Sequence, residues 1–213
     1  MPGAPNLCIK LNCPKSLTHI GHSGKMLFMK RFLIILILIF TLQTSSQADD
    51  IRDFQIEGMS VGDSLLDFFT KKEIKESINQ DAYEGSDGKF SLTNFDSSSD
   101  VYDILQIHFK TNDKNFLIYS IDGVFAFNKT TKECNTEKIE IKKSISDIFA
   151  NLKEENIRIE MASGRGFLNR TQYIFKTGDF IEIVCYEYNT SDWINHGRVG
   201  AVREELEDWI SSL

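Results

Sequence analysis

A run of nine apolar residues, Phe32–Phe40, divides this chain into two parts with different chemistry. Two basic residues, Lys30 and Arg31, precede the run, and a polar stretch that ends at Ala48 follows it. A basic segment, a short apolar core and a small-residue exit are typical of a secretory signal peptide. The 11 residues from Phe32 to Leu42 give roughly 16 Å of helix, whereas crossing a bilayer needs about 20 residues. We therefore predict a signal peptide over residues 29–48, with cleavage between Ala48 and Asp49.

The residues upstream of this segment do not fit a signal peptide. Residues 1–25 contain two cysteines, three prolines and three glycines, with no hydrophobic periodicity. Because Met29 lies directly before the basic pair, and Met26 is a second possible start, we interpret residues 1–28 as a gene-model extension. The alternative is an uncleaved membrane anchor with a cytoplasmic tail. A lipid anchor is not predicted, because a lipoprotein needs Cys at the cleavage point and the residue there is Asp49.

Charge is distributed as unevenly as hydropathy. All 31 Asp and Glu lie at or after Asp49, whereas five of the 24 Lys and Arg lie before it. The predicted exported domain, residues 49–213, therefore carries a formal net charge of −12, although the whole chain carries −7. Nucleic acids bind to clustered Lys and Arg with release of counterions, so this charge argues against a nucleic-acid partner. A hydrophobic fraction of 41% is too high for a disordered chain and predicts one folded domain.

The exported domain contains two cysteines, Cys134 and Cys185. An even number of cysteines in an oxidising compartment predicts a disulfide, and two cysteines allow one intramolecular pairing. A redox or nucleophilic pair would favour a short Cys-x-x-Cys spacing, which these residues lack. The alternative is a pair of free, buried thiols.

Hydrophobic periodicity predicts an α+β domain. Apolar and polar residues alternate in strands over 101–110 and 116–121, in a short strand over 124–127 and in a hairpin over 172–175 and 180–188. Helical spacing predicts a helix over 132–152 and shorter helices near 58–69, 71–79 and 200–213. We interpret Asp122-Gly123 as a turn between two strands. The expected fold is an antiparallel sheet with the helices packed on one face, which places Cys134 and Cys185 in the same helix–sheet interface.

Two turns of the chain repeat almost the same sequence. Phe109-Lys-Thr-Asn-Asp113 follows one predicted strand, and Phe175-Lys-Thr-Gly-Asp179 follows another. Each strand comes after a helix with a similar apolar pattern, Ser64–Phe69 or Ser144–Phe149. The repeat is consistent with two tandem helix-then-hairpin units, or with the common use of the same turn residues.

Three segments carry a resemblance to known proteins: 58–69 (Gly-Met-Ser-Val-Gly-Asp-Ser-Leu-Leu-Asp-Phe-Phe), Tyr173–Tyr188 with its Lys-Thr-Gly-Asp turn and Cys185, and the ending Arg198-Val to Asp208-Trp-Ile210. Together they resemble a group of uncharacterised short exported proteins of marine alphaproteobacteria. The resemblance covers most of residues 51–213 and implies no activity. The plan also resembles small outer-membrane assembly lipoproteins and β-lactamase-inhibitor-like modules. The lipidated Cys of those lipoproteins is missing here, so lipid tethering is not implied.

Catalytic motifs are absent from the sequence of the exported domain. Its two histidines are His108, which we interpret as a solvated residue on the polar side of a strand, and His196, in a loop close to Asp192. No Gly-x-Ser-x-Gly or His-Glu-x-x-His accompanies either one. The acidic stretches do not have the spacing of a calcium loop. We therefore predict no cofactor and no metal, and we note Asp192 and His196 as a candidate functional loop.

These observations favour a non-catalytic periplasmic or secreted protein that binds a protein, a peptide or a small ligand. The first alternative is a small periplasmic hydrolase with a site near Asp192 and His196. The second is a domain held at the inner membrane through its N-terminal segment, which would be its only contact with a membrane.

Overall fold

The computed structural model describes residues 50–125, 130–161 and 164–213. Its strands form one antiparallel sheet in the order β1-β2-β3-β7-β6-β5-β4. The bounds are Phe90–Asp96 (β1), Ile104–Lys110 (β2), Ile118–Phe125 (β3), Lys153–Glu160 (β4), Gly166–Ile174 (β5), Phe180–Tyr188 (β6) and His196–Val202 (β7). The predicted α+β class and the antiparallel sheet are confirmed, and the sheet is the larger part of the fold.

The α-helices of the described residues are α2 (Lys71–Glu76), α3 (Thr131–Ile148) and α4 (Glu204–Ser211). Both α2 and α3 begin at a capping box, in which Thr70 and Thr130 exchange hydrogen bonds with the Glu three residues later. This sequence pattern satisfies backbone N–H groups that would otherwise have no partner in the first turn. It explains why each helix begins at its threonine.

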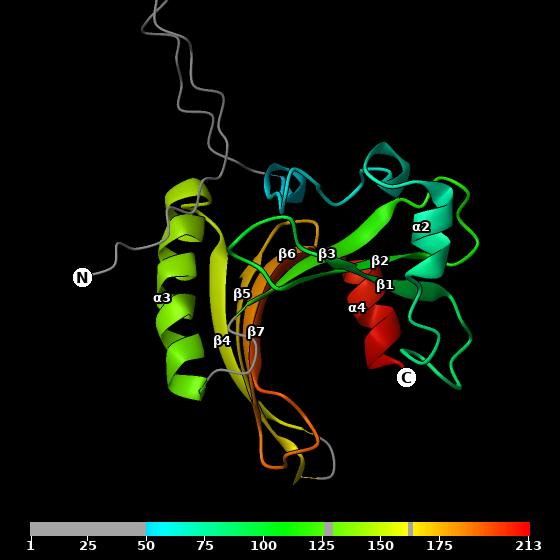
Figure 1. The fold of residues 1–213 in the computed structure, drawn as a ribbon. Coiled ribbons are helices and arrows are strands. Elements are labelled where there is room, and N and C mark those ends of the chain that lie inside the picture. Colours follow the sequence, from blue (N-terminus) through cyan, green and yellow to red (C-terminus); the bar gives the residue numbers. More distant parts are fainter. Residues whose placement is uncertain (1–49, 126–129, 162–163) are drawn as a thin grey trace, which may run out of the picture. The chain divides into compact units, whose positions relative to one another are not determined.

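Helices cover both faces of the sheet, so the expectation that all helices pack on one face is wrong. Cys134 and Ile145 of α3 pack in the main core with Ile181 of β6. Leu206 of α4 packs instead with Phe180, the residue directly before Ile181. Because successive residues of a strand point to opposite faces, α3 and α4 lie on opposite sides of β6. Figure 1 shows the two helices on either side of strands β4–β7.

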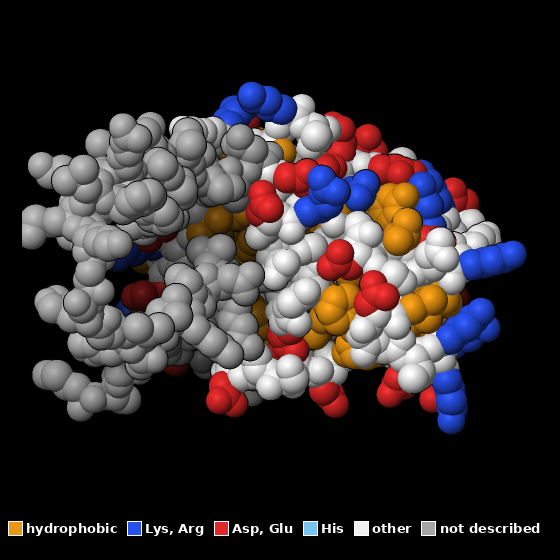
Figure 2. Space-filling view, turned by 90° about the horizontal axis from the view of Figure 1, so that it is seen from above, with side chains coloured by type: hydrophobic (Ala, Val, Ile, Leu, Met, Phe, Trp, Pro, Cys, Tyr) orange, Lys and Arg blue, Asp and Glu red, His pale blue; other side chains and the backbone are white. Residues whose placement is uncertain are grey.

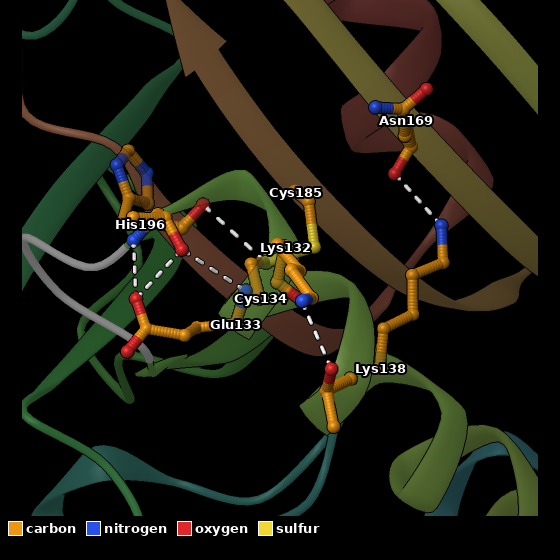
Figure 3. The surroundings of a disulfide bond; sticks show 9 residues. Lys132, Glu133, Cys134, Lys138, Asn169, Cys185 and His196 are labelled. Carbon is orange, nitrogen blue, oxygen red and sulfur yellow. Dashed lines mark hydrogen bonds between the residues drawn. A yellow bond between two sulfur atoms is a disulfide. The ribbon is translucent and has the colours of Figure 1, made fainter.

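A disulfide joins α3 to the sheet. Cys134 in the first turns of α3 and Cys185 in β6 lie at disulfide-bonding distance, with their Cα atoms 6.0 Å apart. Farther along α3, the ammonium group of Lys138 donates a 2.8 Å hydrogen bond to the backbone oxygen of Asn169 in β5 (Figure 3). The helix is therefore connected to two neighbouring strands, and the cysteine pairing predicted from the sequence is the one found.

Two local predictions are wrong, each because a tertiary contact overrides a local signal. Asp122 and Gly123 lie inside β3 rather than in a turn. A Cβ atom at residue 123 would lie 2.5 Å from the ring of Tyr102, so glycine is needed for this ring to pack against the strand. The segment 58–69 contains only a 3₁₀ turn, Leu65–Asp67. Its backbone N–H at Leu65 is bonded to the oxygen of Phe116, which ties the segment to the start of β3.

The described residues contain no helix long and apolar enough to cross a membrane. The predicted signal peptide, with Ala48 and Asp49, lies outside the described residues. On the face seen in Figure 2, hydrophobic side chains reach the surface in small areas separated by acidic and basic side chains. This face therefore offers no broad apolar area outside the part drawn in grey.

We expect Cys185→Ala to lower the melting temperature by about 10 °C. The disulfide closes a loop with a sequence separation of 51, and restricting a loop of that size in the unfolded chain contributes about 4 kcal/mol. Differential scanning calorimetry with and without reductant measures the effect. Reductant should lower the wild-type value to that of the variant and leave the variant unchanged. Equal melting temperatures in oxidising buffer would contradict the prediction.

Candidate functional site

Four charged side chains lie on the α4 face of the central strands. They are Asp122 of β3, Arg170 of β5, Glu182 of β6 and Arg198 of β7. Asp122, Glu182 and Arg198 are each next in sequence to a residue of the main core, Ile121, Ile181 or Val199. Asp122 and Glu182 are each 1% exposed. Because burying a charge is costly unless it is paired, the partners of these groups decide what the site can do.

The sheet register brings the two carboxylates to one place. Asp122 pairs with Gly200 of β7, and Gly200 pairs with Glu182 on the other side. An ideal Cβ at residue 200 would lie 2.1 Å from the Oδ1 atom of Asp122 and 2.5 Å from the backbone oxygen of Ile121. Glycine is therefore required at position 200, since its missing side chain leaves the space that the Asp122 carboxylate occupies.

Glu182 is shared between two arginines. Its Oε1 atom accepts a 3.0 Å hydrogen bond from Nη2 of Arg198, and its Oε2 atom accepts one from Nε of Arg170. Arg170 also donates from both terminal nitrogens to Oε1 of Glu207 on α4, at 3.1 Å. One ionic network thus joins strands β5, β6 and β7 to the helix that covers them.

Asp122 and Arg198 each keep one buried polar atom without a hydrogen-bond partner among the described residues. Ser120 donates to Oδ2 of Asp122 at 2.8 Å, but Oδ1 accepts no hydrogen bond. The Nε atom of Arg198 lies 3.5 Å from that Oδ1 and donates no hydrogen bond. The two atoms therefore form a buried ion pair with each other without a hydrogen bond.

A cavity of about 320 Å³ opens beside these atoms. The four charged residues, Glu207 and a mixed set of other side chains line it; the polar members include Tyr83, Gln106, His108, Ser120 and Tyr186, and the apolar ones include Leu92, Val184 and Leu206. Protein pockets that bind small molecules begin at about 300 Å³ and combine an apolar wall with a few polar groups. The cavity has both properties.

His108 is buried, so the prediction that it is a solvated strand residue is wrong. It is 5% exposed, and its Nε2 atom lies 2.6 Å from the hydroxyl of Tyr83, a residue of the segment between α2 and β1. The indole N–H of Trp209 on α4 donates to Asp87 of the same segment, which holds this cover on the sheet. Burial lowers the pKa of His108 to about 3, so its imidazole is neutral.

Burial has the opposite effect on Asp122, because the charged form of an acid is the one that burial disfavours. Burial raises the pKa of Asp122 to about 6, with Arg198 opposing the rise and Glu182 adding to it. Asp122 therefore changes its charge within the physiological pH range. Buried groups with such shifts, lining a cavity, are typical of functional sites.

The loop predicted from the sequence is adjacent to this cavity but has a different arrangement. The ring of His196 stacks on Tyr186 at 4.6 Å between centroids, and its Nδ1 atom lies 2.9 Å from the backbone oxygen of Ile194. Asp192 is exposed, and in the described part of the chain no hydrogen bond or ion pair joins it to His196. Cys134 and Cys185 lie on the opposite face of the sheet.

The charged cluster was not predicted from the sequence, although a signal is present. Glu182 lies between Ile181 and Ile183, and Asp122 follows Ile121 in a strand of mostly buried residues. Charged residues that alternate with β-branched residues in a central strand indicate either a solvated face or a buried ionic site. In this protein α4 and Tyr83 cover the charged face, so the site is buried and ionic rather than solvated. The local sequence does not reveal this cover.

No family model, curated protein or solved structure matches this chain. In the described residues no group of three or more His, Cys, Asp or Glu side chains is arranged to hold a metal ion.

We expect Asp122→Asn to change how stability depends on pH. Because the pKa of Asp122 is raised from 3.8 to about 6 in the folded protein, its contribution is complete below pH 3.8 and lost as pH rises through about 6. Between pH 4 and pH 7.5 the wild type should therefore lose about 2 kcal/mol relative to the variant. Urea unfolding at both pH values measures this difference. Asp96→Asn, at an exposed position of β1, is the control, and parallel profiles for wild type and Asp122→Asn would contradict the prediction.

Proposed function

We propose that this chain is a non-catalytic, exported binding protein that holds a small polar ligand in the cavity between α4 and the sheet. The observation that carries the proposal is the cavity beside the ion pair of Asp122 and Arg198, in which the facing atoms, Oδ1 and Nε, lie 3.5 Å apart and neither makes a hydrogen bond. A buried donor or acceptor without a partner costs about 1–3 kcal/mol, and more when it is charged. A ligand that supplies the missing hydrogen bonds recovers this free energy on binding.

The rigidity of the network favours binding over a purely structural role. Replacing a buried ion pair by well-packed apolar residues is often neutral or stabilising, so stability alone does not account for four charges on one sheet face. Each charge is fixed on a strand, and Glu182 is held from both sides by Arg170 and Arg198. Sites on strands keep their geometry better than sites on loops, which reduces the cost of binding.

The hydrolase alternative would need His196 to activate a nucleophile and Asp192 to orient it. The contacts of His196 with Tyr186 and with the backbone at Ile194 support an aromatic, structural role at the edge of the cavity instead. We therefore keep the non-catalytic proposal.

We also propose that the protein functions outside the cytoplasm, in the periplasm or after secretion. The cysteine pair at bonding distance supports an oxidising compartment, since disulfides persist there. The sequence of residues 29–48 supports export by a cleaved signal peptide.

The tandem plan is part of the same proposal. The two similar turns follow β2 and β5, and each leads into the antiparallel neighbour of that strand, β3 or β6. This placement supports two related units, one on each side of β7, in which α2 rather than the predicted helix at Ser64–Phe69 comes before the first hairpin.

Export is tested by the intact mass of the native product in a cell fraction. We expect a species that begins at Asp49, is found in the periplasm or medium, and is two hydrogens lighter than its reduced form. A membrane-bound species that retains residues 29–48 would contradict the proposal and favour the anchored alternative.

Ligand binding is tested by thermal shift with a panel of amino acids, monosaccharides, disaccharides, monocarboxylates and amines. A ligand at 100 times its dissociation constant adds about 2.7 kcal/mol to folding, which raises the melting temperature by about 5–10 °C. Glu182→Gln should abolish the shift, because it removes the charge that holds both arginines. Glu155→Gln, on the edge strand β4, is the matched control and should keep it. If no compound shifts the wild type, the proposal fails.

A further inference from the structure

The two edges of the sheet differ in what lies beside them. At β1, the segment after α2 covers the outer side: the N–H of Asn79 donates to the oxygen of Leu92 at 2.9 Å. The N–H of Asn94 donates to the oxygen of Ser77 at 3.3 Å. At the other edge, β4 has no strand on its outer side among the described residues, and every residue of β4 except Glu155 is exposed. An open edge of this length is a template for a further strand.

The hydrogen-bond pattern of β4 shows which of its backbone groups point outward. Just after the strand ends, the N–H of Met161 donates to the oxygen of Gly166 in β5 at 2.9 Å. In an antiparallel ladder, successive residues bond alternately to one neighbour and point away from it. Because the pairing of β4 with β5 is regular, the N–H and C=O groups of Glu154, Asn156 and Arg158 point away from β5.

A second copy of β4 matches this edge in an antiparallel register that places the two Asn156 residues opposite each other on a two-fold axis. Glu154 of each copy then lies opposite Arg158 of the other copy. Opposed residues share one face of a sheet, so the carboxylate and the guanidinium group meet. All three opposed pairs use outward-pointing backbone groups, and each pair exchanges two hydrogen bonds. A contact with this symmetry closes at two subunits.

The side chain of Arg158 is available for such an ion pair. In the described part of the chain it forms no ion pair, and its guanidinium carbon lies 4.4 Å from the centre of the Phe167 ring. Glu154 accepts hydrogen bonds from Lys142 and Asn156 at its Oε1 atom. Since a carboxylate accepts at both oxygens, an additional bond from Arg158 of a second copy is compatible with these contacts.

The charges of β4 also disfavour the neighbouring registers. A shift of one residue would turn the strand onto the wrong face, so the alternatives differ by two residues. A shift in one direction places Glu154 opposite Glu160 of the other copy, twice by symmetry. A shift in the other direction places Glu155 opposite its own copy. Like charges directly opposite each other are destabilising, so the charge pattern selects the register that pairs Glu154 with Arg158.

The other face of β4 carries two exposed isoleucines, Ile157 and Ile159, which are 36% and 38% exposed. In the selected register Ile157 lies diagonally across the axis from its own copy, within reach of a long side chain. Ile159 lies opposite Lys153, whose aliphatic stem can cover it. Pairing therefore removes apolar surface from water on one face and joins opposite charges on the other.

We propose that two copies of this chain associate through β4, in the register that pairs Glu154 with Arg158, and extend the sheet across a two-fold axis. The interaction surface is separate from the proposed ligand cavity, and its partner is a second copy of the chain.

Sedimentation velocity on the native product tests this proposal, at protein concentrations up to about 0.5 mM because small interfaces associate weakly. We expect a monomer–dimer equilibrium. Arg158→Glu places Glu154 opposite a second carboxylate and should raise the dissociation constant at least tenfold. The double variant Glu154→Arg with Arg158→Glu restores opposite charges and should recover most of this loss. Lys75→Glu, at an exposed position of α2, changes the net charge as Arg158→Glu does and should leave the dissociation constant unchanged.

Cysteine trapping tests the position of the axis. In a hydrogen-bonded antiparallel pair the Cα atoms lie about 5.5 Å apart, which is within the range of a disulfide. Asn156→Cys should therefore form a covalent dimer under mild oxidation at least tenfold faster than Glu160→Cys, whose copies lie at opposite ends of the paired strands.

Three results would each overturn the proposal. The first is a wild type that stays monomeric over the whole concentration range. The second is a dimer that Arg158→Glu does not weaken, or that the double variant does not recover although its melting temperature shows that it is folded. The third is equal trapping of Asn156→Cys and Glu160→Cys.

Discussion

The carboxylate of Glu182 is the partner on which the whole ionic network depends. It is almost completely buried and accepts hydrogen bonds from Arg170 and Arg198. Without it, two guanidinium groups would face each other across β6 with only Glu207 and Asp122 to balance them. Breaking a buried ion pair from one side costs about 3–5 kcal/mol, because the remaining charge stays buried. The position of α4 also depends on this carboxylate, since Arg170 links Glu182 to Glu207.

The sheet separates two environments with different tasks. On the α3 face, Ile107, Ile181 and Val199 form a core with the helix, and the disulfide joins that helix to β6. This face supplies the apolar burial that stabilises the fold. Because this apolar burial already stabilises the fold, the opposite face of the same central strands can accommodate buried charges. In a domain with a single core, burying these charges would cost too much free energy. The glycine at position 200 belongs to this second face, where it makes room for Asp122.

Periodicity in the sequence predicts the elements well where one side of an element is apolar. The helix that contains Cys134, the strand around Ile107 and the hairpin that leads to Cys185 are all found close to their predicted positions. The site could not be predicted in the same way. Period-two alternation places His108 on the polar side of its strand, and the sequence predicts Asp122 in a turn, but neither signal says whether the residue meets water or another part of the protein. The cover comes from Tyr83 and α4, which are far from both residues in sequence.

Asp122-Gly123 illustrates why the strongest local signal was also the most misleading one. An Asp-Gly pair favours a turn because both residues adopt turn geometry easily. Inside β3 the same pair has two tertiary functions: Gly123 makes room for the ring of Tyr102 on one face, and Asp122 extends over Gly200 on the other. Residues that break a local rule in a well-paired strand are expected at functional or strained sites. The break at Asp122 is found where its carboxylate is buried and paired with Arg198, so the departure from local preference and the candidate site coincide at one residue.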